Sequence, residues 1–427
     1  MIDLKRLRQD PEGSRAGLLR RLDGSVTQAV DALLGLDRER RELLVRVERL
    51  KSERNAASEE VARRKRAKEP ADQLMAKLKA SGEEVKALDA RLRDIEADLE
   101  RQAMSLPNFP ADGTPDGDAT ANRMVRSWGE PPTFDFQPKP HWELAAALGI
   151  LDLPAGAKLT GSGFPVFRGM GARLVRALAA FMLDLHTREH GYTEVAVPYL
   201  VNRATLTGTG QLPKFEEDLY GLPADDLFLI PTAEVPVTNL HRDEIFDAGA
   251  LPLGYVAFTP CFRREAGAHG KDTRGLIRVH QFDKVELVRF SRPEDSDAEH
   301  QRLTGHAEAV LQRLGIPYRV VELAAGDTGF ASARTYDLEV WAAGVGAWLE
   351  ASSSSTFTDF QARRANIRFR REPRAKPEFV HTLNASGVAF PRTIIALLEN
   401  NQAADGSVRV PEALVPYLGV DRLASPA

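Results

Sequence analysis

The segment 258–286, FTPCFRREAGAHGKDTRGLIRVHQFDKVE, places cationic and acidic side chains between two apolar stretches that are typical of strands. Arg263 and Glu265 alternate at the end of the first stretch, and Phe282 and Glu286 would share one face of the second. Guanidinium groups bind phosphate oxygens, aromatic rings stack on bases, and carboxylates bind ammonium groups or Mg²⁺. The glycine-rich middle is expected to be a mobile loop. The segment predicts a site for a nucleotide and an amine, although a surface hairpin of paired charges fits the spacing equally well.

Three later segments carry further polar side chains among apolar ones. Glu234 lies in PTAEVPVTN, and Glu350 precedes a run of four serines in WLEASSSSTFTDFQARR. A carboxylate buried there would need a cation or hydrogen-bond donors, and the alternative for Glu350 is a salt bridge to a neighbouring arginine. In LNASGVAFPRTIIALLEN, Asn384, Ser386 and Arg392 accompany the start of a predicted helix, where an anion is stabilised.

The usual loop motifs for nucleotide binding are missing. The chain contains no Gly-x-x-x-x-Gly-Lys-Ser/Thr phosphate loop, and GTGQLPK lacks the required glycine spacing. It also contains no Gly-x-Gly-x-x-Gly segment between a strand and a helix. A nucleotide would therefore have to be held by side chains on strands.

Composition narrows the class of protein. The 427 residues, 43% hydrophobic and 28% charged, are enough for two or three globular domains. The single cysteine, Cys261, excludes a disulfide framework and a cysteine-based metal site, and the net charge of −4 does not by itself indicate a nucleic-acid partner. No apolar run reaches the ~18 residues of a membrane span, and the N-terminus lacks the apolar core of a signal peptide. We therefore expect a cytoplasmic protein with no membrane partner.

Residues 26–103 have the composition and period of two long helices. Leucine, valine and alanine recur at alternating spacings of three and four residues, and Pro70 interrupts the pattern. We expect an antiparallel helical hairpin that projects from a body. Basic side chains gather toward its tip, where a phosphate backbone could be bound. The period fits a dimerisation coiled coil equally well, and a charged run is usually a solvated face.

From residue 141 onward, helical and strand patterns alternate. Strand candidates such as YVAFTPCFRRE, LIRVHQFDKVELVRF, YDLEVWA and WLEASSSSTFTDFQARRANIRFR predict a mostly antiparallel β-sheet with helices against it, an α+β fold. The expected domains are 1–104 with the helical hairpin, a linker and entry strand rich in proline and glycine at 105–140, and a catalytic body at 141–427.

Together these segments resemble the bacterial-type seryl-tRNA synthetases, which are class II aminoacyl-tRNA synthetases, nearly from end to end. FRREAGAHGKDTRGLIRVHQF resembles their motif 2, HGYTEVAVPYLV their motif 1 at the dimer interface, and NASGVAFPRTIIALLEN their motif 3. GTGQLPKF, TAEVPVTN and TDFQARRANIRFR are highly specific to that family, and residues 26–103 resemble its tRNA-binding arm. The resemblance implies a class II catalytic body, a homodimer, and a ligase that activates L-serine with ATP and Mg²⁺ and transfers it to tRNA(Ser).

The resemblance also implies a role for each matching side chain. Three would be catalytic: Arg263 at the serine carboxylate and the α-phosphate, Glu265 at the adenine amino group, and Arg392 at the adenine face and γ-phosphate. The serine-binding set would be Thr232, Ala233 and Glu234 near the amino group, Arg263, Glu286 at the hydroxyl, Asn384 and Ser386. The ATP-binding set would be Arg263, Arg264, Glu265, Val279, Phe282, Glu350, Ala351, Ser352, Ser353 and Arg392, with Glu350 and Ser353 also at Mg²⁺. The tRNA-binding residues of the arm would be Arg54, Arg63, Arg64 and Arg66.

Departures from the family motifs cluster where the resemblance places the adenylate. Ala385 and Pro391 stand where the family usually has glycine, Phe390 replaces a smaller apolar residue, and Ser352–Phe357 replaces a run that contains cysteines. Because glycine lets the backbone come close to a ligand, Ala385 and Pro391 are expected to narrow that approach.

The departures leave three alternatives to an ordinary enzyme. One is a catalytically altered copy that acts in antibiotic self-resistance or biosynthesis, another a non-catalytic tRNA-binding paralogue, and the third a ligase that loads a carrier protein. Every charged side chain that has an implied role is present, and carrier ligases of this type lack the arm. Both observations favour the active enzyme.

Overall fold

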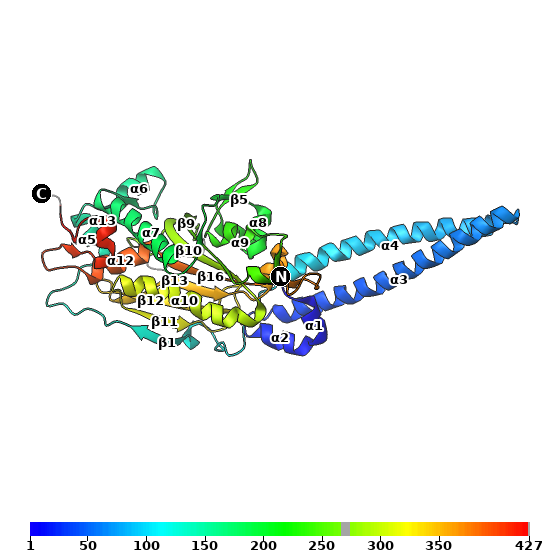
Figure 1. Cartoon of the computed structure of the whole chain (residues 1–427), viewed down its shortest axis with the longest axis horizontal. Coiled ribbons are helices and arrows are strands. Elements are labelled where there is room, and N and C mark those ends of the chain that lie inside the picture. The colour runs from blue at the N-terminus through cyan, green and yellow to red at the C-terminus, as the bar shows by residue number, and fades with distance from the viewer. Residues whose placement is uncertain (266–273, 426–427) are drawn as a thin grey trace. The chain divides into compact units, whose positions relative to one another are not determined.

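The computed structural model describes residues 1–265 and 274–425, which form two compact units (Figure 1). The helical unit contains Ile2–Leu19 and Asp23–Pro107. The second unit, called the body below, contains Met1, Arg20–Leu22 and the residues from Asn108 onward. The predicted domain boundaries after residues 104 and 140 stay predictions.

The helical unit is an antiparallel hairpin with two short helices packed near the start of its first long helix. Its members are α1 (Leu4–Gln9), α2 (Pro11–Leu19), α3 (Val26–Ala67) and α4 (Asp72–Ser105), and α3 and α4 run side by side (Figure 1). The helix α3 ends where Lys68 adopts a left-handed conformation, φ 57°, two residues before Pro70. The buried seam contains Val30, Leu33, Val47, Val61, Val85, Ile95 and Leu99. The predicted helical hairpin is confirmed.

Ion pairs between α3 and α4 fix the register of the hairpin. Arg46 lies 2.5 Å from Glu84, and Lys51 lies 3.1 Å from Asp89. Because these side chains are about half-exposed, each pair contributes little to stability. The apolar seam therefore supplies most of the energy that holds the two helices together.

The body is built on one eight-stranded, almost wholly antiparallel sheet. Its strand order is β1–β11–β12–β13–β16–β10–β9–β4, and β4 runs parallel to β9. The strands are β1 (Arg123–Trp128), β4 (Thr193–Glu194), β9 (Leu253–Phe262), β10 (Gln281–Ser291), β11 (Tyr318–Glu322), β12 (Arg334–Ala342), β13 (Ala347–Thr356) and β16 (His381–Ala389). The predicted α+β fold with a mostly antiparallel sheet is confirmed.

Shorter strands and nine helices complete the described part of the body. The small sheets contain β2 (Leu151–Asp152) with β3 (Val166–Phe167), β5 (Leu200–Asn202) with β6 (Gly221–Leu222) and β7 (Leu227–Leu229), β8 (Ile245–Asp247) with β14 (Arg368–Arg370) and β15 (Glu378–Phe379), and β17 (Val408–Arg409) with β18 (Arg422–Leu423). The helices are α5 (His141–Ala147), α6 (Leu153–Leu159), α7 (Met170–Arg188), α8 (Arg203–Thr209), α9 (Glu234–Asn239), α10 (Ser296–Arg313), α11 (Phe360–Ala365), α12 (Phe390–Asn400) and α13 (Val415–Leu418). Within the described ranges, no helix combines the length and apolarity needed to cross a membrane.

Residue alternation separates the two faces of the central sheet. On β10, Val285 and Leu287 are fully buried in the main hydrophobic cluster, which includes side chains of α7, α10 and α12. Lys284 and Glu286 point to the opposite face, because successive strand residues alternate. One face of the sheet therefore packs on α7, α10 and α12. The other face carries polar side chains at Lys284 and Glu286, and further along β10 it packs on a second hydrophobic cluster that includes side chains of α9 and α11.

Several strand boundaries differ from the prediction. The strand β10 begins at Gln281, so residues 276–280 of the predicted strand LIRVHQFDKVELVRF lie outside it. The strand β9 ends at Phe262, so Arg263 and Glu265 do not alternate on a strand, and the left-handed conformation of Glu265, φ 51°, breaks the extended chain. Thr358, with φ 49°, likewise ends the run that follows β13, and α11 takes the place of the predicted strand. Of the predicted mobile loop, residues 266–273 lie outside the described residues.

Candidate active site

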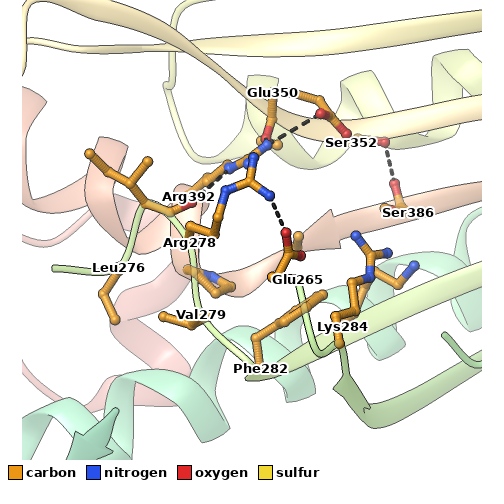
Figure 2. A pocket seen from close by; sticks show the side chains of 15 residues that line it. Glu265, Leu276, Arg278, Val279, Phe282, Lys284, Glu350, Ser352, Ser386 and Arg392 are labelled. Carbon is orange, nitrogen blue, oxygen red and sulfur yellow. Dashed lines mark hydrogen bonds and ion pairs between the residues drawn. The ribbon is translucent and has the colours of Figure 1, made fainter. Parts of the chain in front are cut away.

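Two adjoining cavities are lined by side chains from the polar face of the central sheet. The outer cavity, shown in Figure 2, has a volume of ≈ 300 Å³, and the inner cavity has a volume of ≈ 510 Å³. Four residues line both: Arg263, Lys284, Glu350 and Ser386. A ligand with two chemically distinct parts could therefore occupy both cavities, with its junction beside two cations.

Two pairs of opposite charge line the outer cavity (Figure 2). Arg392, in the first turn of α12, donates from Nη1 to the carbonyl oxygen of Glu350 at 2.6 Å and lies 3.3 Å from its Oε2. Arg278 forms an ion pair with Glu265. Arginines that are paired in the absence of a ligand can exchange their partners for phosphate oxygens, which they bind with two parallel hydrogen bonds.

An aromatic ring and a guanidinium group lie together in the same cavity. The Arg263 guanidinium lies 5.2 Å from the centroid of the Phe282 ring, and both side chains line the outer cavity. Val279 and Ala351, both buried, add apolar surface to its wall. Such a combination suits a ligand that has a flat base at one end and phosphates at the other.

The inner cavity is built around two buried carboxylates and one buried ammonium group. Glu234 begins α9, and its Oε1 accepts a hydrogen bond from Gln361 Nε2 at 2.6 Å. Glu286 is 1% exposed; its Oε1 accepts from Asn384 Nδ2 at 3.2 Å, and its Oε2 lies 2.5 Å from Lys284 Nζ. Burying a second carboxylate beside a single ammonium group leaves the cavity short of positive charge.

Burial raises the pKa of Glu234 to about 7, and the nearby Glu286 adds to the shift. The hydrogen bond from Gln361 and the charges of Lys284 and Arg263 oppose it. A carboxyl group with such a pKa is partly protonated at neutral pH and loses its proton when a cationic ligand binds.

Most of the predicted amino-acid-binding residues meet in the inner cavity. Those that line it are Thr232, Glu234, Arg263, Glu286, Asn384 and Ser386. Ala233 does not, because its side chain is fully buried in a hydrophobic cluster with Val237 and Val288. The structure therefore brings together the polar side chains of this set but not the side chain of Ala233, and the binding of serine by these residues stays a prediction.

The predicted nucleotide-binding residues divide between the two cavities. The outer cavity is lined by Arg263, Glu265, Val279, Phe282, Glu350, Ala351, Ser352 and Arg392, and the inner cavity by Ser353. Arg264 lines neither of them and lies 5.9 Å from the Tyr220 ring centroid.

Glu350 differs from its predicted environment. Its side chain is 48% exposed, so the expectation of a buried carboxylate is wrong. It lies beside a β-bulge in the pairing of β12 with β13, where the regular alternation of faces is lost. The alternative, a salt bridge to a neighbouring arginine, is present as the contact with Arg392.

Three residues that contact the carboxylates of the site had no predicted role: Lys284, Arg278 and Gln361. Lys284 lies at an alternate position between Phe282 and Glu286, so the period of a strand could have placed it on their face. Arg278 lies in the segment that was predicted to bind phosphates, but no spacing distinguished it from its neighbours. Gln361 comes from α11, and nothing in the sequence connects it with Glu234.

The departures in motif 3 have different environments. Ala385 is fully buried in the main hydrophobic cluster, because its neighbours Asn384 and Ser386 take the opposite face of β16. Phe390 is 2% exposed and belongs to the same cluster, 5.6 Å from Phe258 between ring centroids. The expectation that Ala385 narrows the ligand site is wrong, and Phe390 lines neither cavity. Pro391 does line the outer cavity, so its effect on a ligand stays a prediction.

The basic residues of the arm lie on the surface of the helical unit. Arg63 and Arg64 each lie 2.7 Å from Glu60, and their hydrogen bonds lower the pKa of that carboxyl to about 2. Arg66 donates from Nε to the carbonyl oxygen of Ala62 at 3.2 Å, and Arg54 is half-buried. Exposed pairs of this kind are weak, so phosphate groups could replace the Glu60 carboxylate.

Comparison with known proteins identifies the family. A model described as the seryl-tRNA synthetase N-terminal domain matches residues 1–110, and the tRNA synthetase class II core domain (G, H, P, S and T) matches residues 215–401. The serine–tRNA ligase of Geobacillus kaustophilus is 56% identical over 98% of this chain and 99% of its own length. The seryl-tRNA synthetase from Pyrococcus horikoshii complexed with ATP has a TM-score of 0.95 at 38% identity and covers 100% of both chains. The cytoplasmic serine–tRNA ligase from Naegleria fowleri in complex with AMP has a TM-score of 0.88 at 29% identity and covers 98% of this chain and 96% of its own. The chain belongs to the seryl-tRNA synthetase family of class II aminoacyl-tRNA synthetases, the ligases that join serine to tRNA.

Proposed function

We propose that the inner cavity binds L-serine, that the outer cavity binds ATP, and that Arg263 lies where the two react. The observation that carries this proposal is the pair of buried carboxylates, Glu234 and Glu286, beside a guanidinium group that lines both cavities. A carboxylate oxygen of serine attacks the α-phosphorus of ATP, the bond to the bridging oxygen breaks, and pyrophosphate leaves. The seryl group then passes from the adenylate to the 3′-terminal adenosine of tRNA(Ser), and AMP is released.

Serine would be held by its three polar groups. Glu234 would bind the ammonium group, with Thr232 beside it. Glu286 would accept a hydrogen bond from the side-chain hydroxyl, and Asn384 and Ser386 would close that end of the cavity. Alanine would leave the buried Glu286 without its partner, so a site of this kind discriminates strongly in favour of the hydroxyl.

ATP would lie in the outer cavity with its base between two flat groups. Phe282 would stack on one face of adenine and Arg392 on the other, while Glu265 would accept a hydrogen bond from the adenine amino group. Arg263 would bind the α-phosphate, and Ser352 lies nearby on β13. The related structures that hold ATP and AMP support this use of the nucleotide.

Glu350 and Ser353 suit a magnesium ion that shares its ligands with phosphates. Within the described residues, no three acidic, histidine or cysteine side chains form a metal-binding group. Mg²⁺ usually takes one or two carboxylates together with phosphate oxygens and water, and the half-exposed Glu350 beside the Ser353 hydroxyl meets that need. Once bound, the ion would neutralise phosphate charge.

The arm would bind tRNA(Ser) through Arg54, Arg63, Arg64 and Arg66, and the enzyme would act as a homodimer in the cytoplasm. The family to which residues 1–110 belong supports the first of these roles. Nothing in the comparisons favours a role in antibiotic self-resistance or biosynthesis, a non-catalytic paralogue or a carrier-protein ligase.

The proposal is tested by ATP–pyrophosphate exchange with serine, threonine, alanine and glycine, followed by aminoacylation of tRNA(Ser). Serine alone should support rapid exchange and give charged tRNA. An enzyme that exchanges equally well with alanine would contradict the role of Glu286. An enzyme that exchanges with none of the four would contradict the proposed function.

Serine-dependent exchange should depend on the protonation of Glu234. Because only the ionised carboxylate binds an ammonium group well, kcat/KM for serine should rise about tenfold per pH unit below pH 7 and level off above it, as expected for one titrating group with a pKa of about 7. The measurement is the exchange rate at low serine from pH 5.5 to 8. In Glu234→Gln the value should be low and flat, and a wild-type profile in that variant would contradict the assignment.

The same titration predicts how serine affects stability. The pKa of Glu234 is raised from an ordinary value of 4.5, so between pH 4.5 and about 7 the folded state holds a proton that the unfolded state releases. The unliganded protein therefore loses stability as the pH rises through this window, and bound serine should offset the loss. Serine should raise the melting temperature more at pH 7.5 than at pH 5.5.

Ala385→Gly should affect stability and leave substrate binding unchanged. The change removes a buried methyl group and places glycine inside a strand, which together cost about 1–2 kcal/mol of unfolding free energy. Urea denaturation and the KM values for serine and ATP are the measurements. Altered KM values at unchanged stability would mean that the methyl group does approach the ligand.

A further inference from the structure

Lys284 is the buried cation of the inner cavity, and none of the roles above uses it. Its side chain is 6% exposed. Its Nζ lies 2.5 Å from Glu286 Oε2 and donates a hydrogen bond to Thr232 Oγ1 at 2.9 Å. It lines both cavities, and Figure 2 shows it near Phe282 on β10. One ammonium group therefore connects the proposed hydroxyl-binding and amino-binding sides of the serine site.

The charges around this lysine raise a question of orientation. Serine carries one ammonium group and one hydroxyl, and the cavity offers it two buried carboxylates, Glu234 and Glu286. If both carboxylates carried an uncompensated charge, the ammonium group could bind to either of them. Bound at Glu286, serine would direct its carboxylate group away from the productive position beside Arg263, and no adenylate would form.

We propose that Lys284 is a positioning residue that neutralises Glu286, so that the substrate ammonium group binds only at Glu234 and Glu286 serves as an acceptor for a neutral hydroxyl. This inference rests on the proposed binding of serine in the inner cavity. It deepens that function because Lys284, in addition to Glu234 and Glu286, would determine the orientation of bound serine and the preference for its hydroxyl group.

The contacts of Glu286 agree with this division of roles. Oε1 is occupied by Asn384 Nδ2, and Oε2 faces the lysine. Among the described residues, Oε2 has no partner with the alignment of a hydrogen bond, although the ammonium group is close enough for an ion pair. A lone pair on Oε2 is thus left for a hydroxyl, while the adjacent positive charge disfavours a second ammonium group.

An analogue of serine separates this role from simple structural support. L-2,3-Diaminopropionate replaces the side-chain hydroxyl with an amine and keeps every other group. In the wild-type enzyme the Lys284 charge should exclude its side-chain ammonium group. In Lys284→Met the charge of Glu286 is no longer compensated. The two amines of the analogue should then each bind a carboxylate, one at Glu234 and the other at Glu286.

The experiment compares kcat/KM for serine and for the diamine in ATP–pyrophosphate exchange. In Lys284→Met the diamine-to-serine ratio should rise by at least about tenfold, which corresponds to ~1.4 kcal/mol. Lys284→Met/Glu286→Gln should lose that gain, because the uncompensated carboxylate is gone. Lys284→Arg, which keeps the positive charge, should keep the wild-type preference for serine.

Controls distinguish the possible failures. Lys158→Met removes an exposed lysine and should leave the ratio at the wild-type value. If Lys284→Met does not fold, as judged by thermal unfolding, Lys284→Gln keeps a donor for Thr232 and is subject to the same prediction. A folded variant that weakens serine and the diamine by the same factor would overturn the inference. A wild-type enzyme without serine-dependent exchange would instead overturn the proposed function.

Discussion

Arg263→Ala is expected to slow serine-dependent ATP–pyrophosphate exchange by about a hundredfold or more, the usual loss when a preorganised transition-state contact is removed. Arg263 lines both cavities, so its guanidinium group lies where the serine carboxylate must meet the α-phosphate. During the in-line displacement, negative charge is spread over the phosphate oxygens. A cation held in place before the reaction stabilises that charge without reorganisation. The measurement is the exchange rate at saturating serine and ATP.

The adjacent arginine is a matched control for this experiment. Arg264 has the same charge and size, but its guanidinium lies near the Tyr220 ring and lines neither cavity. Arg264→Ala should change the exchange rate by no more than about twofold, as expected for a side chain away from the reaction. Equal losses in the two variants would contradict the separation of their roles, and wild-type exchange in Arg263→Ala would contradict the mechanism.

The fold could be predicted from the sequence wherever a simple period decides the structure. The spacing of three and four residues in 26–103 requires a helical seam, and Pro70 fixes the place where the chain turns back. In the body, alternation along β10 places Val285 in the core and Lys284 opposite it. The ends of strands were less predictable, because the left-handed conformations of Glu265 and Thr358 leave no signal in residue type.

The candidate site could be predicted in its residue types but less well in its environments. Glu234 is buried as the sequence suggested, whereas Glu350 is exposed beside a β-bulge that no sequence pattern predicts. Ala385 was expected to touch the ligand because of its position in a motif, but strand alternation directs its methyl group into the core. Gln361 reaches Glu234 from a distant segment, and a contact of that kind follows only from the tertiary structure.

Shortening the arm is expected to abolish aminoacylation of tRNA(Ser) and to leave adenylation nearly intact. Joining Glu42 to Asp94 through a short glycine-rich turn would remove the outer parts of α3 and α4 with all four proposed tRNA-binding arginines. The ion pair between Arg8 and Asp37, 2.9 Å, would remain within the helical unit. Every residue that lines the two cavities belongs to the body, so serine-dependent exchange should stay within about twofold of the parent rate.

The loss of aminoacylation should come from weaker tRNA binding, and its dependence on salt can show this. Replacing Arg54, Arg63, Arg64 and Arg66 together with glutamine keeps the helices but removes the charges. If all four contact phosphates, the slope of log affinity against log salt should fall by about three to four units, since each phosphate contact contributes about 0.7 to 0.9 of a unit. Tight tRNA binding with an unchanged slope in the quadruple variant would place the contacts elsewhere. A shortened enzyme that charges tRNA(Ser) at the parent rate would mean that the hairpin is a structural coiled coil. The molecular mass of that variant in solution would then show whether α3 and α4 hold two copies of the chain together.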